Sequence, residues 1–251
     1  MAAPDTNLTP IGNCSACEFR STLLASDKCV PGDSCIAVDS GRQMDRFLKA
    51  NPELAARYLT DDFWERRAVA VRYVNPALLP GLIKDPDEAV RRAVAYRLPR
   101  DQLFELMEDE DREVRITVAD RLPEEQLERM ATDKDYLVRS YVVQRLKPGR
   151  LFRFIRDEDR QVRKQVARRL PEESLALMYM DEEPEIRKIV ASRLEGPAVV
   201  PLLSDPDWTV RLEATFNAPL ENVKAMLNDE DPEVQRVAEE RLAAEQPSDQ
   251  V

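Results

Sequence analysis

The stretch DPDEAVRRAVAYRLPRDQLFELME, residues 85–108, is one copy of a unit that recurs with a fixed period of 24 residues. Aspartate opens every copy, at Asp61, Asp85, Asp109, Asp133, Asp157, Asp181, Asp205 and Asp229. A half copy, NPELAARYLT at 51–60, matches NPALLPGLIK at 75–84. A repeat of this length predicts an array of similar supersecondary units that begins near residue 51.

The first half of each unit has the pattern of an α-helix. Apolar residues fall four apart, as at Val90, Val94 and Leu98, which places them on one face of a helix. Aspartate at the third position of six units, such as Asp87, is typical of an N-cap, and proline near the fifteenth position, such as Pro99, marks the end of the helix. We therefore predict one helix of about eleven residues per unit.

The second half of each unit has apolar residues at its nineteenth and twenty-second positions, such as Leu103 and Leu106. Three-residue spacing fits a short second helix, either α or 3-10. A unit this small cannot bury its own apolar face, so neighbouring copies must stack into a superhelical solenoid. The prediction is an all-α repeat domain over 51–242, followed by a flexible tail at 243–251.

Arginine occupies the seventh position of seven consecutive units: Arg67, Arg91, Arg115, Arg139, Arg163, Arg187 and Arg211. Stacked helices lie about 8–10 Å apart, so unpaired guanidinium groups at this position would repel one another. The recurring aspartates are their natural partners. We predict that aspartate and arginine interleave, tie the repeats together and cap the helix starts; an anion-binding groove along the arginines is the alternative.

All four cysteines, Cys14, Cys17, Cys29 and Cys35, fall in the first 35 residues, with the spacing C-x2-C-x11-C-x5-C. A segment of about 50 residues with few large apolar side chains cannot stabilise itself by burial alone. We therefore predict a separate module at 1–50 that holds a metal; disulfides are less favoured because no export signal precedes the cysteines. Four thiolates fit either a structural zinc site or an iron–sulfur cluster, and the spacing leaves both open.

Composition argues against several classes of function. The 251 residues include 48 acidic and 37 basic residues and no histidine, for a net charge of −11, which argues against a globally basic nucleic-acid binder. Without histidine the chain has no Ser-His-Asp triad and no His-ligated catalytic zinc, and no pair of carboxylates stands out as catalytic. No stretch reaches the roughly 18–20 apolar residues of a membrane helix. We expect a cytoplasmic protein that makes no membrane contact. A non-catalytic role is favoured, and an enzyme that works through carboxylates or lysine stays the alternative.

A local basic region departs from this acidic background. The unit at 133–156 contains seven basic residues against two acidic ones. Two stripes follow at helical spacing, and they are the predicted partner-binding residues: Arg150, Arg153 and Arg156, then Arg160, Lys164 and Arg168. They could dock an acidic partner, with a solvated face as the alternative. Nucleic acid is less favoured because Phe154 holds a core position and no stacking aromatics are interleaved.

A four-cysteine segment followed by blocks of the form DxDxxVRxxVAxRLPxxxLxxM resembles the leucine-rich repeat variant proteins over nearly the whole chain. The resemblance implies a right-handed superhelix of alternating α and 3-10 helices without β-strands. It also implies a 4Fe-4S cluster ligated by Cys14, Cys17, Cys29 and Cys35, in a family associated with nitrogen-fixing bacteria.

The sequence therefore predicts an iron–sulfur protein with a helical-repeat scaffold that binds an unknown protein partner, in redox sensing or electron transfer. The alternative is a solenoid that binds nucleic acid or an acidic partner, in which the four cysteines form a purely structural metal site such as zinc.

Overall fold

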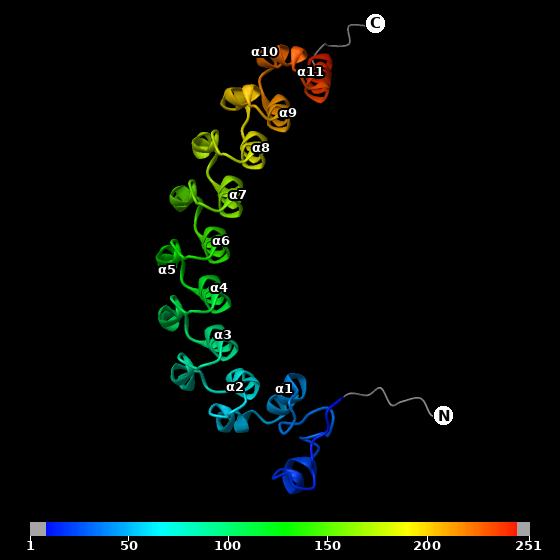
Figure 1. The fold of residues 1–251 in the computed structure, drawn as a ribbon, viewed down its shortest axis with the longest axis vertical. Helices are drawn as coiled ribbons and strands as arrows, with labels where there is room; N and C mark the ends of the chain where they lie inside the picture. Colours follow the sequence, from blue (N-terminus) through cyan, green and yellow to red (C-terminus); the bar gives the residue numbers. More distant parts are fainter. Residues whose placement is uncertain (1–8, 245–251) are drawn as a thin grey trace, which may run out of the picture. The chain divides into compact units, whose positions relative to one another are not determined.

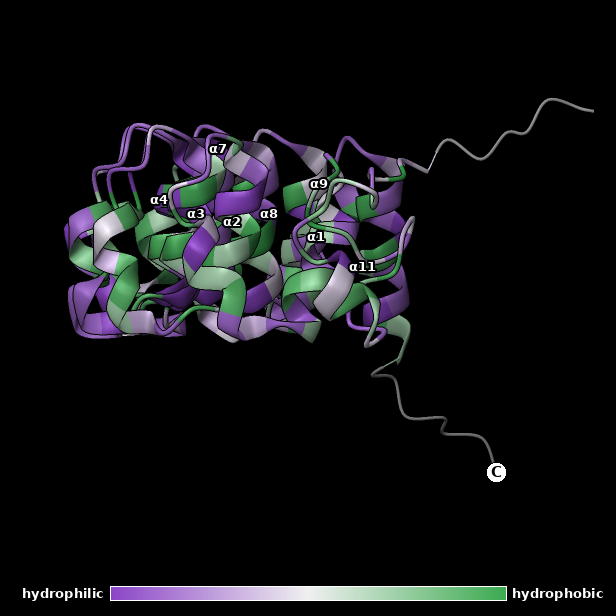
Figure 2. Ribbon diagram, turned by 90° about the horizontal axis from the view of Figure 1, so that it is seen from below, coloured by the Kyte–Doolittle hydropathy of each residue, from purple (hydrophilic) through white to green (hydrophobic). Residues whose placement is uncertain are grey.

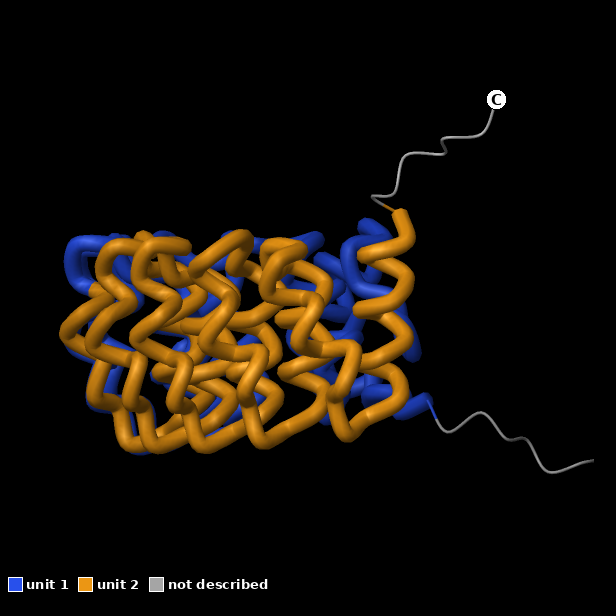
Figure 3. Tube along the Cα trace, turned by 90° about the horizontal axis from the view of Figure 1, so that it is seen from above, with its two compact units in different colours: residues 1–126 blue, residues 127–251 orange. Residues whose placement is uncertain are grey.

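The structure is a computed structural model that describes residues 9–244, and within these residues it is helical, with one isolated β-bridge between Val30 and Ser34 (Figure 1). The chain divides into two compact units, residues 1–126 and 127–251 (Figure 3). The division falls inside the short helix α5 (Glu124–Leu127), and each unit is described by itself. No described helix combines the length and the apolar character that crossing a bilayer requires.

The N-terminal unit contains the cysteine segment and the first repeats. Its elements are a single π-helical stretch η1 (Arg20–Leu24), then α1 (Gly41–Ala50), η2 (Pro52–Tyr58), α2 (Trp64–Val71), η3 (Pro76–Leu82), α3 (Glu88–Arg97), η4 (Arg100–Leu106) and α4 (Arg112–Arg121). From η2 onward the label η marks a 3-10 helix. Neighbouring α-helices pack on one another, α1 on α2 and α2 on α3, so the α-helices form one layer of the unit.

The C-terminal unit continues the same alternation. Its elements are η5 (Glu128–Met130), α6 (Tyr136–Arg145), η6 (Pro148–Phe154), α7 (Arg160–Arg169), η7 (Glu172–Met178), α8 (Pro184–Arg193), η8 (Gly196–Ser204), α9 (Trp208–Asn217), α10 (Leu220–Val223), η9 (Lys224–Asn228) and α11 (Pro232–Ala244). The second helix of the repeat is thus mainly 3-10, preceded by one short α-turn at α5 and α10. Of the predicted tail at 243–251, the first two residues belong to α11 and residues 245–251 lie outside the described chain.

The predicted core and caps are confirmed. Val90, Val94, Leu98 and Leu103 are fully buried, and apolar and polar bands alternate along the helices (Figure 2). The Asp87 carboxylate accepts a hydrogen bond from the Ala89 backbone N–H at 3.0 Å, as an N-cap does. Local capping and the burial of one face therefore determine where each α-helix begins and how it lies.

The aspartate and arginine ladders interleave as predicted. Arg91 binds Asp109 of the next repeat through two parallel hydrogen bonds, of 2.8 Å from Nε and 2.9 Å from Nη2, while its Nη1 donates to the Asp85 backbone carbonyl at 2.9 Å. The same pairing joins Arg67 to Asp85, Arg139 to Asp157, Arg163 to Asp181, Arg187 to Asp205, and Arg211 to Asp229. These guanidinium groups hold repeats together, so the anion-binding alternative is wrong for them.

A second arginine ladder was missed by the sequence analysis. Arginine at the thirteenth position of a repeat reaches back to the last carbonyls of the preceding α-helix; Arg193 Nη1 donates to the Ala167 and Leu170 carbonyls, each at 2.8 Å. Arg97, Arg169 and Arg241 make equivalent bonds. The last carbonyls of an α-helix have no partner within the helix, so this ladder satisfies them from the next repeat.

Candidate metal centre

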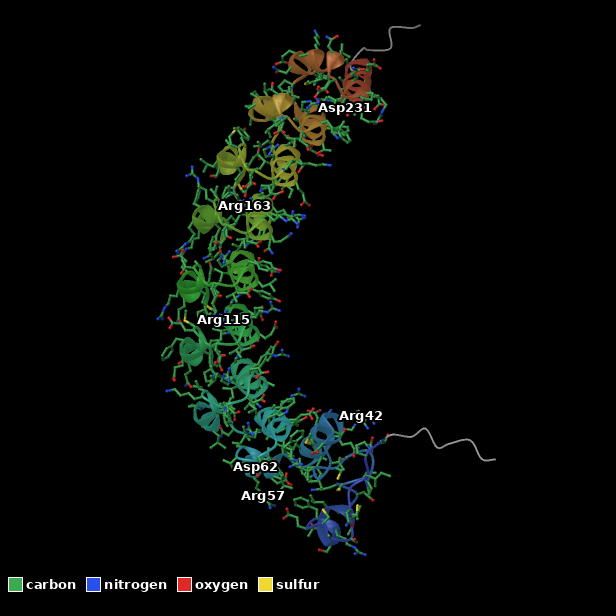
Figure 4. All side chains as sticks on the ribbon, viewed as in Figure 1. Arg42, Arg57, Asp62, Arg115, Arg163 and Asp231 are labelled. Atoms are coloured by element: carbon green, nitrogen blue, oxygen red, sulfur yellow. The ribbon has the colours of Figure 1, made fainter. Side chains whose placement is uncertain are left out.

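The cysteine segment folds against α1 through a few specific side chains. Gln43 Nε2 donates to the Pro10 carbonyl and Asn51 Nδ2 donates to the Lys28 carbonyl, both at 2.9 Å. The Cys35 backbone N–H donates to the Gln43 carbonyl at 3.3 Å. Arg57, labelled in Figure 4, forms an ion pair of 3.0 Å with Glu18. These contacts fix the loops that carry the cysteines onto the first helices of the repeat array.

The four cysteines are unpaired, and two of them, Cys14 and Cys35, lie against Gly12. Cys29 and Cys35 are buried, while Cys14 and Cys17 are half-buried. Cys14 Sγ donates to the Gly12 carbonyl at 3.6 Å, and a Cβ built on Gly12 would lie 3.0 Å from Cys35 Sγ. Any side chain at position 12 would therefore crowd the thiol of Cys35, and glycine leaves room for it.

The thiols influence one another electrostatically. Burial, together with negative charge on Cys35, Cys17 and Cys14, raises the pKa of the Cys29 thiol to about 11. Each of the other three cysteines is therefore close enough to Cys29 to affect its ionisation. Protein groups alone disfavour the thiolate here, whereas a bound metal favours it, because metals bind the deprotonated sulfur.

The donor set fits an iron–sulfur cluster. Among residues 9–244, no group of three or more cysteine or carboxylate side chains is arranged to hold a single metal ion. The donors are four soft sulfur atoms, which both an iron–sulfur cluster and a structural zinc ion accept.

Buried polar atoms without partners gather in the same part of the molecule. Four such side-chain atoms occur in the described chain, and three of them, Ser34 Oγ, Gln43 Oε1 and Asn51 Oδ1, belong to the cysteine segment and α1 or the residue after it. Buried polar groups are usually hydrogen-bonded. Ser34 directly precedes Cys35 in the chain, so one of these unpartnered atoms belongs to the cysteine loops themselves. Nothing in the sequence pattern marked Ser34, and Gly12 was recognisable only as a turn-forming residue.

The predicted partner-binding residues lie on two different layers of the C-terminal unit. Arg150 and Arg153 belong to η6 and Arg156 follows it, whereas Arg160, Lys164 and Arg168 belong to α7. Several already have partners: Arg150 Nη1 lies 3.7 Å from Glu128 Oε1, the Arg153 guanidinium lies 5.9 Å from the Phe154 ring centre, and Lys164 pairs with Glu185. Three of the six therefore lie on η6 or just after it, and three lie on α7.

Comparisons with known proteins match both parts of the chain. A family model described as "LRV protein FeS4 cluster" matches residues 10–57, and one described as "Leucine rich repeat variant" matches residues 88–111 and 112–135. A solved structure entitled "A leucine-rich repeat variant with a novel repetitive protein structural motif" is 66% identical, covers 93% of this chain and 100% of its own, and superposes with a TM-score of 0.89.

A curated relative is the "Uncharacterized 27.7 kDa protein in nifB 3'region" of Rhodobacter capsulatus. It is 40% identical over 86 residues, which is 34% of this chain. The matched region spans 35% of the length of that relative.

Proposed function

Because the chain belongs to the leucine-rich repeat variant family, we propose that Cys14, Cys17, Cys29 and Cys35 hold a 4Fe-4S cluster. Two observations carry this proposal: Cys14 and Cys35 both lie against Gly12, and Cys35, Cys17 and Cys14 all lie near enough to Cys29 to influence its ionisation. These are all the cysteines of the chain, so every iron of the cluster would have a protein ligand and none would be open to a substrate. The site therefore suits electron exchange better than Lewis-acid catalysis.

A bound 4Fe-4S cluster supplies one-electron redox chemistry. The chain contributes an asymmetric setting for it: Cys29 and Cys35 lie on the buried side, and Cys14 and Cys17 on the side nearer solvent. We propose that this protein is a non-enzymatic scaffold whose repeats bind a protein partner, and that the cluster senses redox state or passes one electron at the Cys14 and Cys17 side.

The genetic setting of the Rhodobacter relative, next to nifB, supports a link to nitrogen fixation. If this link holds for our chain, deletion of its gene should slow growth on N2 and leave growth on ammonium unchanged. Equal growth on both nitrogen sources would remove this part of the proposal.

The decisive experiment is a visible absorption spectrum of protein purified without oxygen, with iron and sulfide counts on the same sample. We expect a brown protein with about four iron and four sulfide per chain that bleaches on reduction. The Cys29→Ser variant should lose the colour, and Ser15→Ala, in the same segment, should keep it. A colourless protein with one zinc would contradict the proposal and support a structural metal site.

Gly12→Ala is a finer test of the geometry. Its Cβ would lie 3.0 Å from Cys35 Sγ, whereas a Cβ at Gly81 would meet nothing within 4 Å. We expect Gly12→Ala to lower the iron content and Gly81→Ala to leave it unchanged. Equal iron content in the two variants would show that the thiol of Cys35 is not confined as described.

A further inference from the structure

A groove of about 650 Å³ lies on the α-helical face of the N-terminal unit, between α1, α2 and α3. Arg42 of α1, which lines it, is labelled in Figure 4. The groove is adjacent to the metal centre, since α1 follows the cysteine loops and its Gln43 carbonyl accepts the Cys35 backbone N–H. A molecule bound there would contact the helix that supports the cysteines.

The groove carries excess positive charge in an acidic protein. Four arginines and two carboxylates line it: Arg42, Arg72, Arg92 and Arg97 against Asp45 and Glu65. Arg72 pairs with Asp45 at 3.0 Å, and Arg97 donates to backbone carbonyls of the preceding repeat. The side chains of Arg42 and Arg92 are exposed and make no hydrogen bond or ion pair with any residue of 9–244.

The remaining carboxylate, Glu65, is already stabilised within the protein. It lies against Gly41, the first residue of α1, so closely that a Cβ at position 41 would collide with it. The amino end of a helix carries a partial positive charge that favours a carboxylate. The groove thus retains two unpaired guanidinium groups to offer to an anionic ligand.

Two exposed aromatic side chains accompany the arginines. Trp64 is 41% exposed and Tyr96 is 57% exposed, and both line the groove. Tryptophan, tyrosine and arginine are the residues most enriched among those that dominate binding energy in protein interfaces. Trp64 stands at the fourth position of its repeat and Tyr96 at the twelfth of the next. That difference of eight residues is about 12 Å along the helix direction, and the two helices lie about 8–10 Å apart. The total of about 15 Å is the span of four to five residues of extended peptide.

We propose that this groove docks an extended acidic segment of a protein partner. Carboxylates of the segment pair with Arg42 and Arg92, and two apolar side chains about four residues apart pack on Trp64 and Tyr96. The inference rests on the proposed function, for which it names the docking surface. Single-stranded nucleic acid presents a charge at every nucleotide and needs a continuous row of cations, whereas this groove offers two unpaired guanidinium groups, so an acidic peptide is favoured and nucleic acid becomes an outcome of the test.

The test uses the full chain with its metal centre intact and the synthetic peptide EELEEELE, whose leucines stand four residues apart. The chain has two tryptophans, so a Trp208→Phe background makes Trp64 fluorescence the readout. We expect saturable binding at low salt, and much weaker binding of the uncharged peptide QQLQQQLQ. Absence of saturable binding of EELEEELE, or equal binding of the two peptides, would overturn the proposal.

Matched double variants locate the site. Arg42→Gln with Arg92→Gln should weaken binding by about tenfold, whereas Lys188→Gln with Lys224→Gln removes the same charge from the C-terminal unit and should change binding less than about twofold. All four side chains are exposed, so the visible and circular dichroism spectra should be unchanged. Equal weakening by both double variants would show that the peptide responds to net charge and not to this groove.

Two further results separate this proposal from others. If the oligonucleotide (dT)8 bound more tightly than the peptide, with a steep salt dependence, the groove would be a nucleic-acid interface and the proposal would fail. Peptide binding at the groove by a protein that contains no iron would support the groove while removing the proposed iron–sulfur function.

Discussion

The cysteine segment and the repeats differ in what stabilises their folded structure. In residues 9–40 the only buried apolar side chains are Phe19, Cys29, Cys35, Ile36 and Val38, and none is less than 5% exposed. The single repeat at 85–108 has five fully buried apolar side chains, Val90, Val94, Ala95, Leu98 and Leu103. The repeats are therefore stabilised by contacts with their neighbours, whereas the cysteine segment depends on docking to α1 and on what its thiols bind.

Removal of the metal should have the largest effect, because it should affect the cysteine segment and leave the repeats folded. When the iron is removed by chelation, we expect residues 9–40 to lose their amide protection while the repeats keep theirs, because a metal that binds only the folded segment supplies part of its folding free energy. Hydrogen exchange measured by mass spectrometry reports both regions at once. If protection were lost along the repeats as well, the two regions would fold as one cooperative body and the distinction would be wrong.

Within the repeats, one ladder arginine should matter far more than a surface arginine. The side chains of Arg187 and its partner Asp205 are 10% and 4% exposed, so Arg187→Leu leaves a buried carboxylate without a partner. We expect the free energy of unfolding of the C-terminal unit to fall by about 3–5 kcal/mol. Urea denaturation followed by circular dichroism measures it.

The matched control is Arg236→Leu. Arg236 pairs with Glu233 and Glu240 on the surface, and all three side chains are more than half exposed. Solvent screens such pairs, so the urea midpoint should move only slightly. Shifts of similar size in the two variants would show that the buried ladder does not hold the repeats together.

The ladder could be predicted from the sequence because both partners recur with the period of the structure. Arginine at the seventh position and aspartate at the first have one spacing throughout, so stacking brings each pair together. The arginines at the thirteenth position recur equally well, but their acceptors are backbone carbonyls. Every residue has a carbonyl, so no residue type in the sequence marks the partner.

Contacts that occur only once in the chain, and not in every repeat, could not be predicted from the sequence. The path of the cysteine loops depends on single contacts, such as that of Gln43 with the Pro10 carbonyl, and the resemblance to a family named the ligands without giving their arrangement. The helical spacing of the two basic stripes could be recognised in the sequence. That one stripe lies on η6 and the other on α7, in different layers, is known only from the structure. Trp64 departs from the repeat pattern, yet only the structure places it in one groove with Tyr96.

The smallest expected effect concerns a break in the second ladder, where two repeats lack arginine at the thirteenth position and have Tyr73 and Asn217 instead. At position 217 asparagine replaces arginine, and its Nδ2 donates to the Ala191 carbonyl at 3.0 Å. It makes no bond to the carbonyl of Leu194, whose counterpart Leu170 accepts from Arg193. We expect Asn217→Arg to add that bond and to stabilise the C-terminal unit by about 1 kcal/mol, measured as a higher urea midpoint.

Asn217→Lys shows whether the stabilisation expected of Asn217→Arg comes from the positive charge or from the shape of the guanidinium group. Lysine brings the same positive charge to the end of α8, where the helix dipole favours a cation, but it lacks the planar fork that lets one guanidinium reach two carbonyls. We expect it to stabilise the unit less than arginine does. Equal gains from the two substitutions would mean that the second ladder acts through charge at the helix ends, and that the two-carbonyl geometry of Arg193 adds nothing to stability.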